Sequence, residues 1–232
     1  ARMMFDNPLI IFDCDGVLID SEAIYLEEEF NFLSARNVHV DKVWYMREFM
    51  ALADEKWRAK FSGLIEQNGG TTLSDAEFDA MKDIVRTRIR NEVQPVVGVV
   101  AMLDALTAPR CVASTTSMRF LPGKLERTGL ASHFGNGVFS GDMVAHGKPA
   151  PDLFLHAVRQ MGGETGNAIV VEDSANGVKA GKSAGMFTIG FLGGSHCFDG
   201  HGDTLTDAGA DLILSSHADL ADWLGSNTNA MT

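Results

Sequence analysis

The chain contains 232 residues, a length that fits one large domain or a core domain carrying a smaller inserted one. Apolar residues make up 45% and charged residues 22% of the chain, ordinary values for a globular protein that exclude a disordered chain and a collagen-like repeat. With 19 basic against 31 acidic residues the formal charge is −12, so we expect no binding to nucleic acid or to anionic membranes, both of which require basic surface.

The first predicted element is a short buried strand, and a long helical segment follows it. Leu9–Phe12 is a continuous apolar run, typical of a strand that is buried on both faces of a sheet. From about Ser21 to Arg90, charged and apolar residues alternate at helical spacing. This pattern predicts several amphipathic helices with breaks near Asn37, Gly69–Gly70 and Asn91.

Beyond Pro95 the predicted strands and helices alternate. Strands are expected at residues 111–114, 138–140, 168–171, 187–191 and 212–214, and helices at residues 99–106, 121–128, 152–161, 175–184 and 217–224. We expect Asp152 to cap the helix that it begins, and Gly185 to close another. The polar tail from Ser226 is expected to be loose.

This order of elements predicts the fold class and the domain organisation. Alternating strands and helices form a parallel sheet with helices on both faces, which is a Rossmann-like α/β fold. The first strand belongs to that sheet, yet the next predicted strand begins only at Cys111, and helices fill the interval. We therefore expect a discontinuous core of residues 1–18 and 91–232, with an all-α cap domain of residues 19–90 inserted after the first strand.

Polar residues stand at or shortly after the ends of the first four predicted strands. In chain order these residues are Asp13 and Asp15, Ser114 and Thr115, Lys148, and Glu172 and Asp173. Ligands of a parallel α/β sheet bind at the carboxyl ends of its strands, so we expect these side chains to share one site. A single carboxylate at a strand end is more often a helix cap or a turn residue, and the prediction therefore rests on all four positions together.

Together these residue types suit phosphoryl transfer. The four carboxylates form an all-oxygen set, which favours a hard cation and above all Mg²⁺. The lysine, with the hydroxyls and amides of the serine–threonine pair, would hold the oxygens of a phosphoryl group. One carboxylate is then placed to attack phosphorus in line and to form an aspartyl-phosphate.

Four motifs resemble those of the haloacid dehalogenase-like superfamily. They are Asp13–Ser21 (DCDGVLIDS), Ser114 within Val-Ala-Ser-Thr-Thr, Lys148 within Gly-Lys-Pro-Ala-Pro-Asp, and Glu172–Gly177 (EDSANG). They occur in the family's order and span nearly all of the chain outside the helical segment. The insertion point is similar to that of the β-phosphoglucomutase-like branch, and this resemblance implies a helical cap whose hinge begins at Asp20.

The resemblance implies three catalytic residues. Asp13 would be the nucleophile, Lys148 would neutralise its charge, and Asp15 would act as general acid and then as base. The leaving alkoxide of a phosphate ester needs a proton, and a second aspartate close to the nucleophile can supply it. The dehalogenases of the superfamily lack that second aspartate, so we expect phosphoryl transfer rather than cleavage of a carbon–halogen bond.

The resemblance also implies the binding residues. Ser114, Thr115 and Lys148 would hold the phosphoryl group. Mg²⁺ would be held by Asp13, the main-chain carbonyl of Asp15 and Asp173. Glu172 would either bind the ion directly or contact one of these ligands. The expected activity is therefore that of a Mg²⁺-dependent phosphomonoester hydrolase.

Two alternatives to a phosphatase remain. Phosphosugar mutases of the β-phosphoglucomutase type place a histidine where this chain has Tyr25, and an arginine in a glycine-containing cap loop where it has Met50–Asp54. Both differences favour water as the final acceptor. A more remote alternative is a receiver-like signalling module, which also uses Asp, Ser/Thr and Lys at strand ends but is much shorter and has no inserted cap.

The expected substrate is a small phosphorylated metabolite. Phe12–Asp15, Leu106–Val112 and Phe139–Gly141 resemble stretches of the sugar-phosphate phosphatases that act on 6-phosphogluconate, which suggests a sugar phosphate or a sugar-acid phosphate. Polar side chains on helices are more often solvated than bound to a ligand. The candidate substrate contacts on the cap are Asp20, Tyr25, Arg47, Lys56, Arg58 and Lys60.

The remaining features point to no further chemistry. The spacing of the histidines and acids in His196–Asp203 matches no zinc site, and we interpret this glycine-rich segment as a plain loop near the rim of the site. The three cysteines are widely spaced and form no disulfide framework, and no apolar stretch reaches the length of a membrane span. We therefore expect a cytoplasmic protein. The expected oligomeric state is a monomer or a homodimer.

Overall fold

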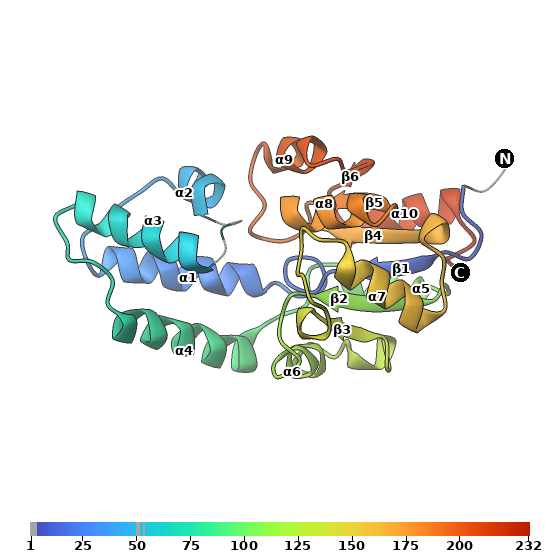
Figure 1. Cartoon of the computed structure of the whole chain (residues 1–232), viewed down its shortest axis with the longest axis horizontal. Coiled ribbons are helices and arrows are strands. Elements are labelled where there is room, and N and C mark those ends of the chain that lie inside the picture. Colours follow the sequence, from blue (N-terminus) through green and yellow to red (C-terminus); the bar gives the residue numbers. More distant parts are fainter. Residues whose placement is uncertain (1–3, 50–51, 53) are drawn as a thin grey trace.

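A parallel sheet forms the centre of the molecule. The computed structural model describes residues 4–49, 52 and 54–232, and within them six parallel strands lie in the order β3-β2-β1-β4-β5-β6 (Figure 1). The strands are β1 (Leu9–Phe12), β2 (Arg110–Ser114), β3 (Val138–Ser140), β4 (Ala168–Glu172), β5 (Phe187–Phe191) and β6 (Leu212–Leu214). The predicted Rossmann-like sheet is thereby confirmed, with β1 inside it between β2 and β4.

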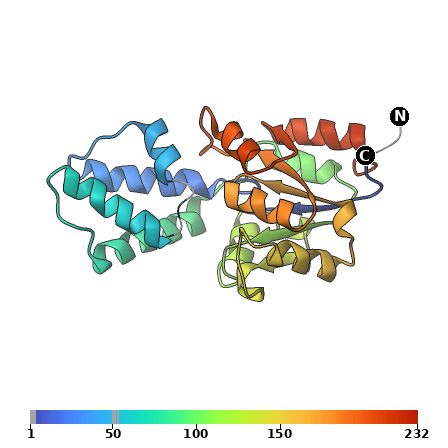
Figure 2. The same ribbon diagram turned by 45° about the horizontal axis from the view of Figure 1, so that its top comes forward.

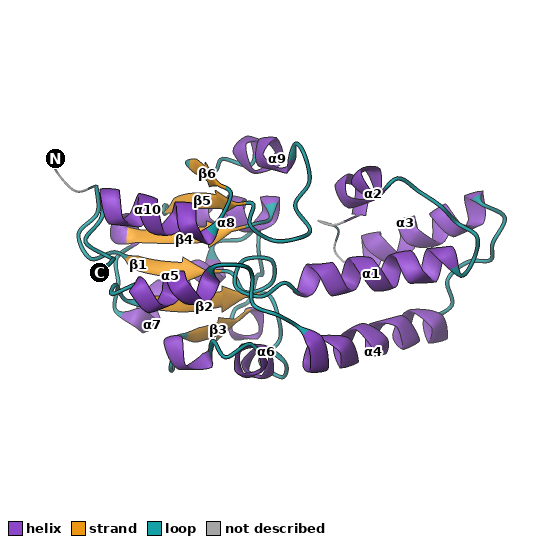
Figure 3. Cartoon of the chain, turned by 180° about the vertical axis from the view of Figure 1, so that it is seen from behind, coloured by secondary structure: helices purple, strands orange, loops and turns teal. Residues whose placement is uncertain are grey.

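Helices cover both faces of this sheet, as Figures 1 and 3 show from opposite sides. They are α5 (Val99–Ala105), α6 (Leu121–Arg127), α7 (Asp152–Met161), α8 (Ala175–Ser183), α9 (His201–Asp207) and α10 (His217–Asn227). Successive strand residues point to opposite faces, so Ile10 and Phe12 join the apolar cluster of α5 and α10, whereas Ile11 joins that of α7. None of the described helices is long and apolar enough to cross a membrane.

Helices between β1 and α5 pack together beside the sheet (Figure 2). These are α1 (Ser21–Ser34), α2 (Lys42–Phe49), α3 (Asp54–Gln67) and α4 (Asp75–Glu92), which we call the helical segment. Tyr45, Phe49 and Phe61 are central to an apolar cluster of its own. The breaks near residues 37, 69–70 and 91 agree with the predicted ones. Within the described residues, α2 and α3 are separate helices, the first ending at Phe49 and the second beginning at Asp54.

The helical segment begins and ends at one place. The amide of Asp20 donates to the carbonyl of Gln94, and the amide of Val96 donates to the carbonyl of Leu18, each at 2.9 Å. The outgoing and returning chains therefore run side by side where they leave the sheet. We propose that the segment is the inserted cap domain and that these paired connections are its hinge.

Two local predictions are wrong at helix starts. The N-cap of α7 is Pro151, not Asp152, because the helical turns already begin at Asp152. Residues 201–207, interpreted as loop, form helix α9, which begins where Gly200 turns the chain with a φ of 93°. Glycine adopts this left-handed conformation without steric cost. Residues 192–200 are therefore loop, as predicted, and the helix starts directly after Gly200.

The prediction of a loose C-terminal tail is also wrong. Helix α10 continues to Asn227, and Ala230 beyond it is fully buried. The carbonyl of Ala230 accepts hydrogen bonds from the amides of Thr107, at 2.7 Å, and Ala108, at 3.2 Å. The tail is held because it supplies backbone acceptors and a small apolar side chain to the turn that precedes β2.

A buried acid makes the stability of the helical segment depend on pH. Glu29 of α1 accepts a hydrogen bond from the Tyr45 hydroxyl at 2.7 Å, and burial raises the pKa of Glu29 from 4.5 to about 8. The unfolded chain releases this proton above pH 4.5, whereas the folded chain keeps it until about pH 8. The stabilisation is therefore complete below pH 4.5 and is lost as the pH rises towards 8.

We expect Glu29→Gln, which stays neutral, to remove this part of the pH dependence. Each pH unit between the two pKa values is worth about 1.4 kcal/mol, so the variant should gain unfolding temperature over the wild type as the pH rises from 5 to about 8. Thermal unfolding at a series of pH values measures this difference in unfolding temperature. Glu126→Gln, at an exposed position of α6, is the control. Parallel pH profiles for Glu29→Gln and the wild type would contradict the burial argument.

Candidate active site

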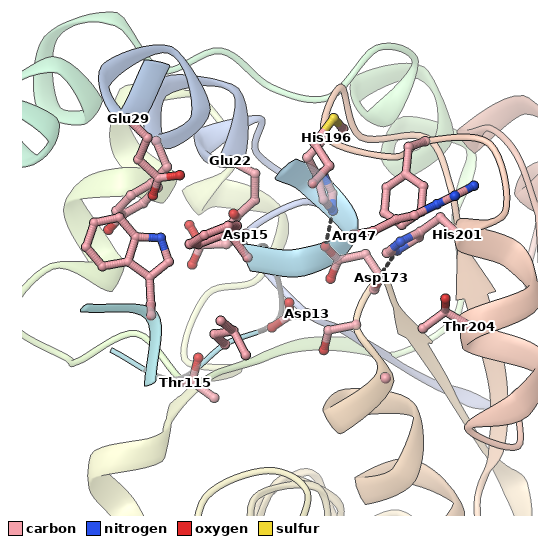
Figure 4. A pocket seen from close by; sticks show the side chains of 18 of the residues that line it. Asp13, Asp15, Glu22, Glu29, Arg47, Thr115, Asp173, His196, His201 and Thr204 are labelled. Carbon is pink, nitrogen blue, oxygen red and sulfur yellow. Dashed lines mark hydrogen bonds and ion pairs between the residues drawn. The ribbon is translucent and has the colours of Figure 1, made fainter. Parts of the chain in front are cut away.

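A cavity of about 730 Å³ lies where the carboxyl ends of the strands face the helical segment (Figure 4). Asp13, Asp15, Thr115 and Asp173 line it from the side of the sheet. Helices α1 to α4 line the other side, and the segment between β5 and α9 completes the wall. The predicted meeting of strand-end residues at one place is therefore seen in the structure.

Asp13, the first residue after β1, is paired with a buried lysine. The Lys148 ammonium donates to Asp13 Oδ1 at 2.9 Å, to Glu172 Oε1 at 2.6 Å and to the carbonyl of Ala113 at 3.0 Å. Burial and then the charge of Glu172 raise the pKa of Asp13, and Lys148 opposes them. The site thus concentrates negative charge around Asp13, and Lys148 offsets only part of it.

Asp15 is held apart from that pair by its own donors. Its carboxylate accepts hydrogen bonds from the Thr116 hydroxyl at 2.6 Å, the Lys124 ammonium at 2.7 Å and the Ser21 hydroxyl at 2.5 Å. Burial favours the neutral acid, but the charge and hydrogen bonds of Lys124, with both hydroxyls, outweigh it and lower the pKa of Asp15. In this arrangement Asp15 is held in its ionised, carboxylate form.

Glu172, the last residue of β4, is buried behind the cavity wall. One of its oxygens accepts from Lys148, and the other accepts from the amide and the hydroxyl of Ser174 at 3.1 and 3.0 Å. Gly177 leaves room for it, because a Cβ at that position would stand 1.9 Å from the carboxyl carbon of Glu172. Glu172 is thereby placed to hold the Lys148 ammonium beside Asp13.

Asp173 is held by two histidines that sequence reasoning interpreted as part of a plain loop. His196 Nε2 lies 2.7 Å from Asp173 Oδ2, and His201 Nε2 lies 2.6 Å from the main-chain carbonyl of Asp173 (Figure 4). Gly16 makes this approach possible, because its φ is +84° and a Cβ there would stand 2.1 Å from Asp173 Oδ2. The signal that could have found the histidines is their position in the segment that leads from the fifth strand into α9.

The structure places the two predicted phosphate-binding hydroxyls differently with respect to the cavity. Thr115 lines the cavity, whereas Ser114 is almost fully buried and its hydroxyl accepts a hydrogen bond from the amide of Thr116 at 3.1 Å. Thr116 and Lys124, which sequence reasoning missed, also line the cavity. The turn after β2 brings Thr116, the last residue of the motif that contains Ser114 and Thr115, to the site. Lys124 is brought there by α6, and no motif in the sequence marks it.

The candidate substrate contacts divide in two. Tyr25 and Arg47 line the cavity, and the Arg47 guanidinium donates to the carbonyl of Asp199 at 2.9 Å. Asp20 instead accepts hydrogen bonds from the amide of Ser195, at 3.1 Å, and from its hydroxyl. The comparison of Met50–Asp54 with a mutase loop falls partly on residues 50, 51 and 53, which lie outside the described part of the chain.

The basic residues of α3 are engaged or exposed elsewhere. Arg58 pairs with Asp75, Lys60 pairs with Glu48, and Lys56 is exposed. These three side chains are not among the described residues that line the cavity. Their placement agrees with the expectation that polar side chains on helices are more often solvated.

The wall that the helical segment contributes is largely apolar, with two acids set into it. Phe49, Trp57 and Phe78 are among its apolar residues. Glu22 and Glu29 project from α1, and burial raises the pKa of Glu22 to about 7 and that of Glu29 to about 8. Close to neutral pH, this part of the cavity therefore offers carboxyl groups that can donate as well as accept hydrogen bonds.

The acids beneath the cavity suit a hard cation. Asp13, Glu172 and Asp173 each offer a carboxylate oxygen, and these oxygens lie within 4.8 Å of one another. Oxygen ligands of this kind are typical of Mg²⁺ sites. The raised pKa of Asp13, caused by burial and by the neighbouring acids, also fits, since a cation would offset the repulsion among the carboxylates.

Comparisons with known proteins agree with this geometry. A model of the haloacid dehalogenase-like hydrolases matches residues 8–185. The chain is 27% identical over 188 residues to the 6-phosphogluconate phosphatase of Escherichia coli (strain K12), an alignment that covers 81% of this chain and 83% of that protein.

Two solved structures are similar over almost the full length. One is a conserved haloacid dehalogenase-like protein of unknown function from Agrobacterium tumefaciens strain C58, with 35% identity, a TM-score of 0.85 and coverage of 94% of this chain and 98% of that one. The other is a hydrolase of the same family from Deinococcus radiodurans R1 with bound phosphate and sodium, with 27% identity, a TM-score of 0.84 and coverage of 97% of each chain.

Proposed function

The chain belongs to the haloacid dehalogenase-like hydrolases, and on this premise we propose that it is a Mg²⁺-dependent phosphatase acting through an aspartyl-phosphate on Asp13. The observation that carries the proposal is the arrangement of Asp13 between the Lys148 ammonium and the other acids, at the floor of a cavity. An ionised carboxylate in that position is a nucleophile, and the groups around it are those that phosphoryl transfer requires.

The first step joins Asp13 to phosphorus. A carboxylate oxygen of Asp13 attacks the phosphoryl group, and the bond from phosphorus to the ester oxygen breaks. Asp13, Asp173 and the main-chain carbonyl of Asp15 would hold Mg²⁺, which when bound would supply positive charge to offset the charge of the phosphoryl oxygens. Thr115 on the cavity wall and Lys148 beside Asp13 are the protein groups that bind and orient the phosphoryl group.

Asp15 moves the protons of the reaction. As an acid it gives a proton to the leaving ester oxygen, and as a carboxylate it takes one from the water that then attacks the aspartyl-phosphate. The second role suits the arrangement seen, because Lys124 and two hydroxyls stabilise the carboxylate form. The first role requires Asp15 to bind a proton, which these donors oppose because they stabilise the carboxylate.

The substrate that we propose is a sugar phosphate or a sugar-acid phosphate. The relative from Escherichia coli is named for 6-phosphogluconate, and the cavity is large enough for a phosphorylated sugar. The carboxyl groups of Glu22 and Glu29 offer hydrogen bonds to sugar hydroxyls, and Arg47 offers a positive charge to an acid group. Tyr25, which lines the cavity, stands where mutases of the β-phosphoglucomutase type have a histidine, and this difference favours hydrolysis over the mutase alternative.

A phosphate-release assay tests this function. We expect the purified protein with MgCl₂ to release many phosphates per chain from at least one member of a panel of sugar phosphates and sugar-acid phosphates. A chelator should stop turnover, and added MgCl₂ should restore it. Phosphorylation of the chain that ends after a single event would contradict the proposal and favour a receiver-like module.

A further inference from the structure

Two buried histidines that take no part in the proposed reaction contact Asp173. His196 and His201 are 4% and 8% exposed, so both imidazoles are almost fully enclosed. Their rings lie edge to face with centroids 5.9 Å apart, and both come from the segment between β5 and the start of α9. Buried imidazoles need hydrogen-bond partners, and Asp173 supplies one to each ring.

The acceptors define which nitrogens carry protons. A main-chain carbonyl only accepts, so His201 Nε2 is protonated and donates to the carbonyl of Asp173. His196 Nε2 donates to the carboxylate in the same way. The ligand atoms of His196, Cys197 and His201 lie within 4.8 Å of one another, but both Nε2 atoms are already directed at Asp173. Both histidines therefore act on this acid through their Nε2 atoms.

We propose that His196 and His201 are positioning residues that set the orientation of Asp173, an inference that rests on the proposed function. His201 fixes the main chain of Asp173, and His196 fixes one oxygen of its carboxylate. The other oxygen is left for the cation. Partners of this kind orient the groups that ligate a metal and tune its affinity.

The segment that carries the histidines is itself anchored on the helical segment. Ser195 donates both its amide and its hydroxyl to Asp20 at the proposed hinge. Phe198 packs against the apolar cluster of the helical segment, and the carbonyl of Asp199 accepts from Arg47 of α2. The histidines are thus held from one side by the helical segment while they hold Asp173 on the other.

Calorimetric titration with MgCl₂ in the absence of substrate tests this inference. His196→Met fills the same space without an N–H donor, and His196→Gln offers an amide N–H in its place. We expect His196→Met to bind Mg²⁺ roughly 10- to 100-fold more weakly than the wild type, the range typical of lost partners of metal ligands. His196→Gln should recover most of the affinity, and exposed His146→Met should leave it unchanged.

A purely structural role gives a different result. It would lower the unfolding temperature of His196→Met at every MgCl₂ concentration and leave the Mg²⁺ dissociation constant at the wild-type value, which would overturn the inference. His201→Met serves as the second variant if His196→Met does not fold. A wild type that neither binds Mg²⁺ nor releases phosphate would instead refute the proposed function. If the wild type does both and His196→Met binds Mg²⁺ equally well, only the role of the histidines is refuted.

Discussion

Replacing Asp13 by asparagine is expected to abolish turnover and to leave the fold intact. The amide cannot attack phosphorus, so kcat should fall by at least about 10³-fold, the scale on which enzymes lose activity without their nucleophile. Lys148 keeps its hydrogen bonds to Glu172 and to the carbonyl of Ala113. Burial and the neighbouring acids disfavour the charged form of Asp13, so the neutral amide in Asp13→Asn should not lower the unfolding temperature.

Phosphate release and thermal unfolding, measured on the same preparations, check this expectation. Asp222→Asn, an exposed change on α10, is the matched control and should keep wild-type activity. Asp13→Ala guards against slow conversion of the asparagine back to aspartate. A folded Asp13→Asn protein that retains a substantial part of the wild-type kcat would contradict the role of Asp13 as nucleophile.

Replacing Asp15 by asparagine is expected to separate two steps of the reaction. Loss of the acid should reduce kcat/KM for alkyl phosphates by about 10²- to 10⁴-fold, the usual contribution of a general acid. The reduction should be much smaller for p-nitrophenyl phosphate, whose leaving group needs no proton. The amide oxygen that Asp15→Asn introduces can still accept a hydrogen bond from Lys124, so the local structure should survive.

Loss of the base has its own kinetic effect. With p-nitrophenyl phosphate, Asp15→Asn should release a rapid burst of one nitrophenol per chain, followed by slow turnover, because the aspartyl-phosphate forms but is hydrolysed slowly. Stopped-flow absorbance measures the burst, and Asp222→Asn again serves as the control. Equal losses of kcat/KM on both kinds of substrate, without a burst, would argue against both roles of Asp15.

The sheet and the residues at its strand ends are predictable from the sequence because local patterns determine them. Short apolar runs such as Leu9–Phe12 mark strands that are buried on both faces, and the strand order places Asp13, Thr115 and Asp173 at the same edge. The resemblance of four motifs to one family adds the expected roles. The helices between β1 and α5 are equally predictable, because charged and apolar residues alternate there at helical spacing and the short apolar runs of the core strands are missing.

The rest of the site depends on contacts between distant parts of the chain. Lys124 and Thr116 reach Asp15 across more than 100 residues of sequence, and each alone is an ordinary polar residue. His196 lies in a glycine-rich stretch typical of a loop, and only the fold brings its ring to Asp173. The buried tail around Ala230 was missed for the same reason, because its partners precede β2.

The aspartyl-phosphate on Asp13 is the centre of the account, and one measurement tests it directly. The wild type, mixed with substrate and MgCl₂ and quenched in acid within the first turnover, can be digested and analysed by mass spectrometry. We predict that the peptide containing Asp13 carries one phosphoryl group, which hydroxylamine removes, and that the group is absent from Asp13→Asn. A first turnover that releases product while the Asp13 peptide stays unmodified at every quench time would contradict the account.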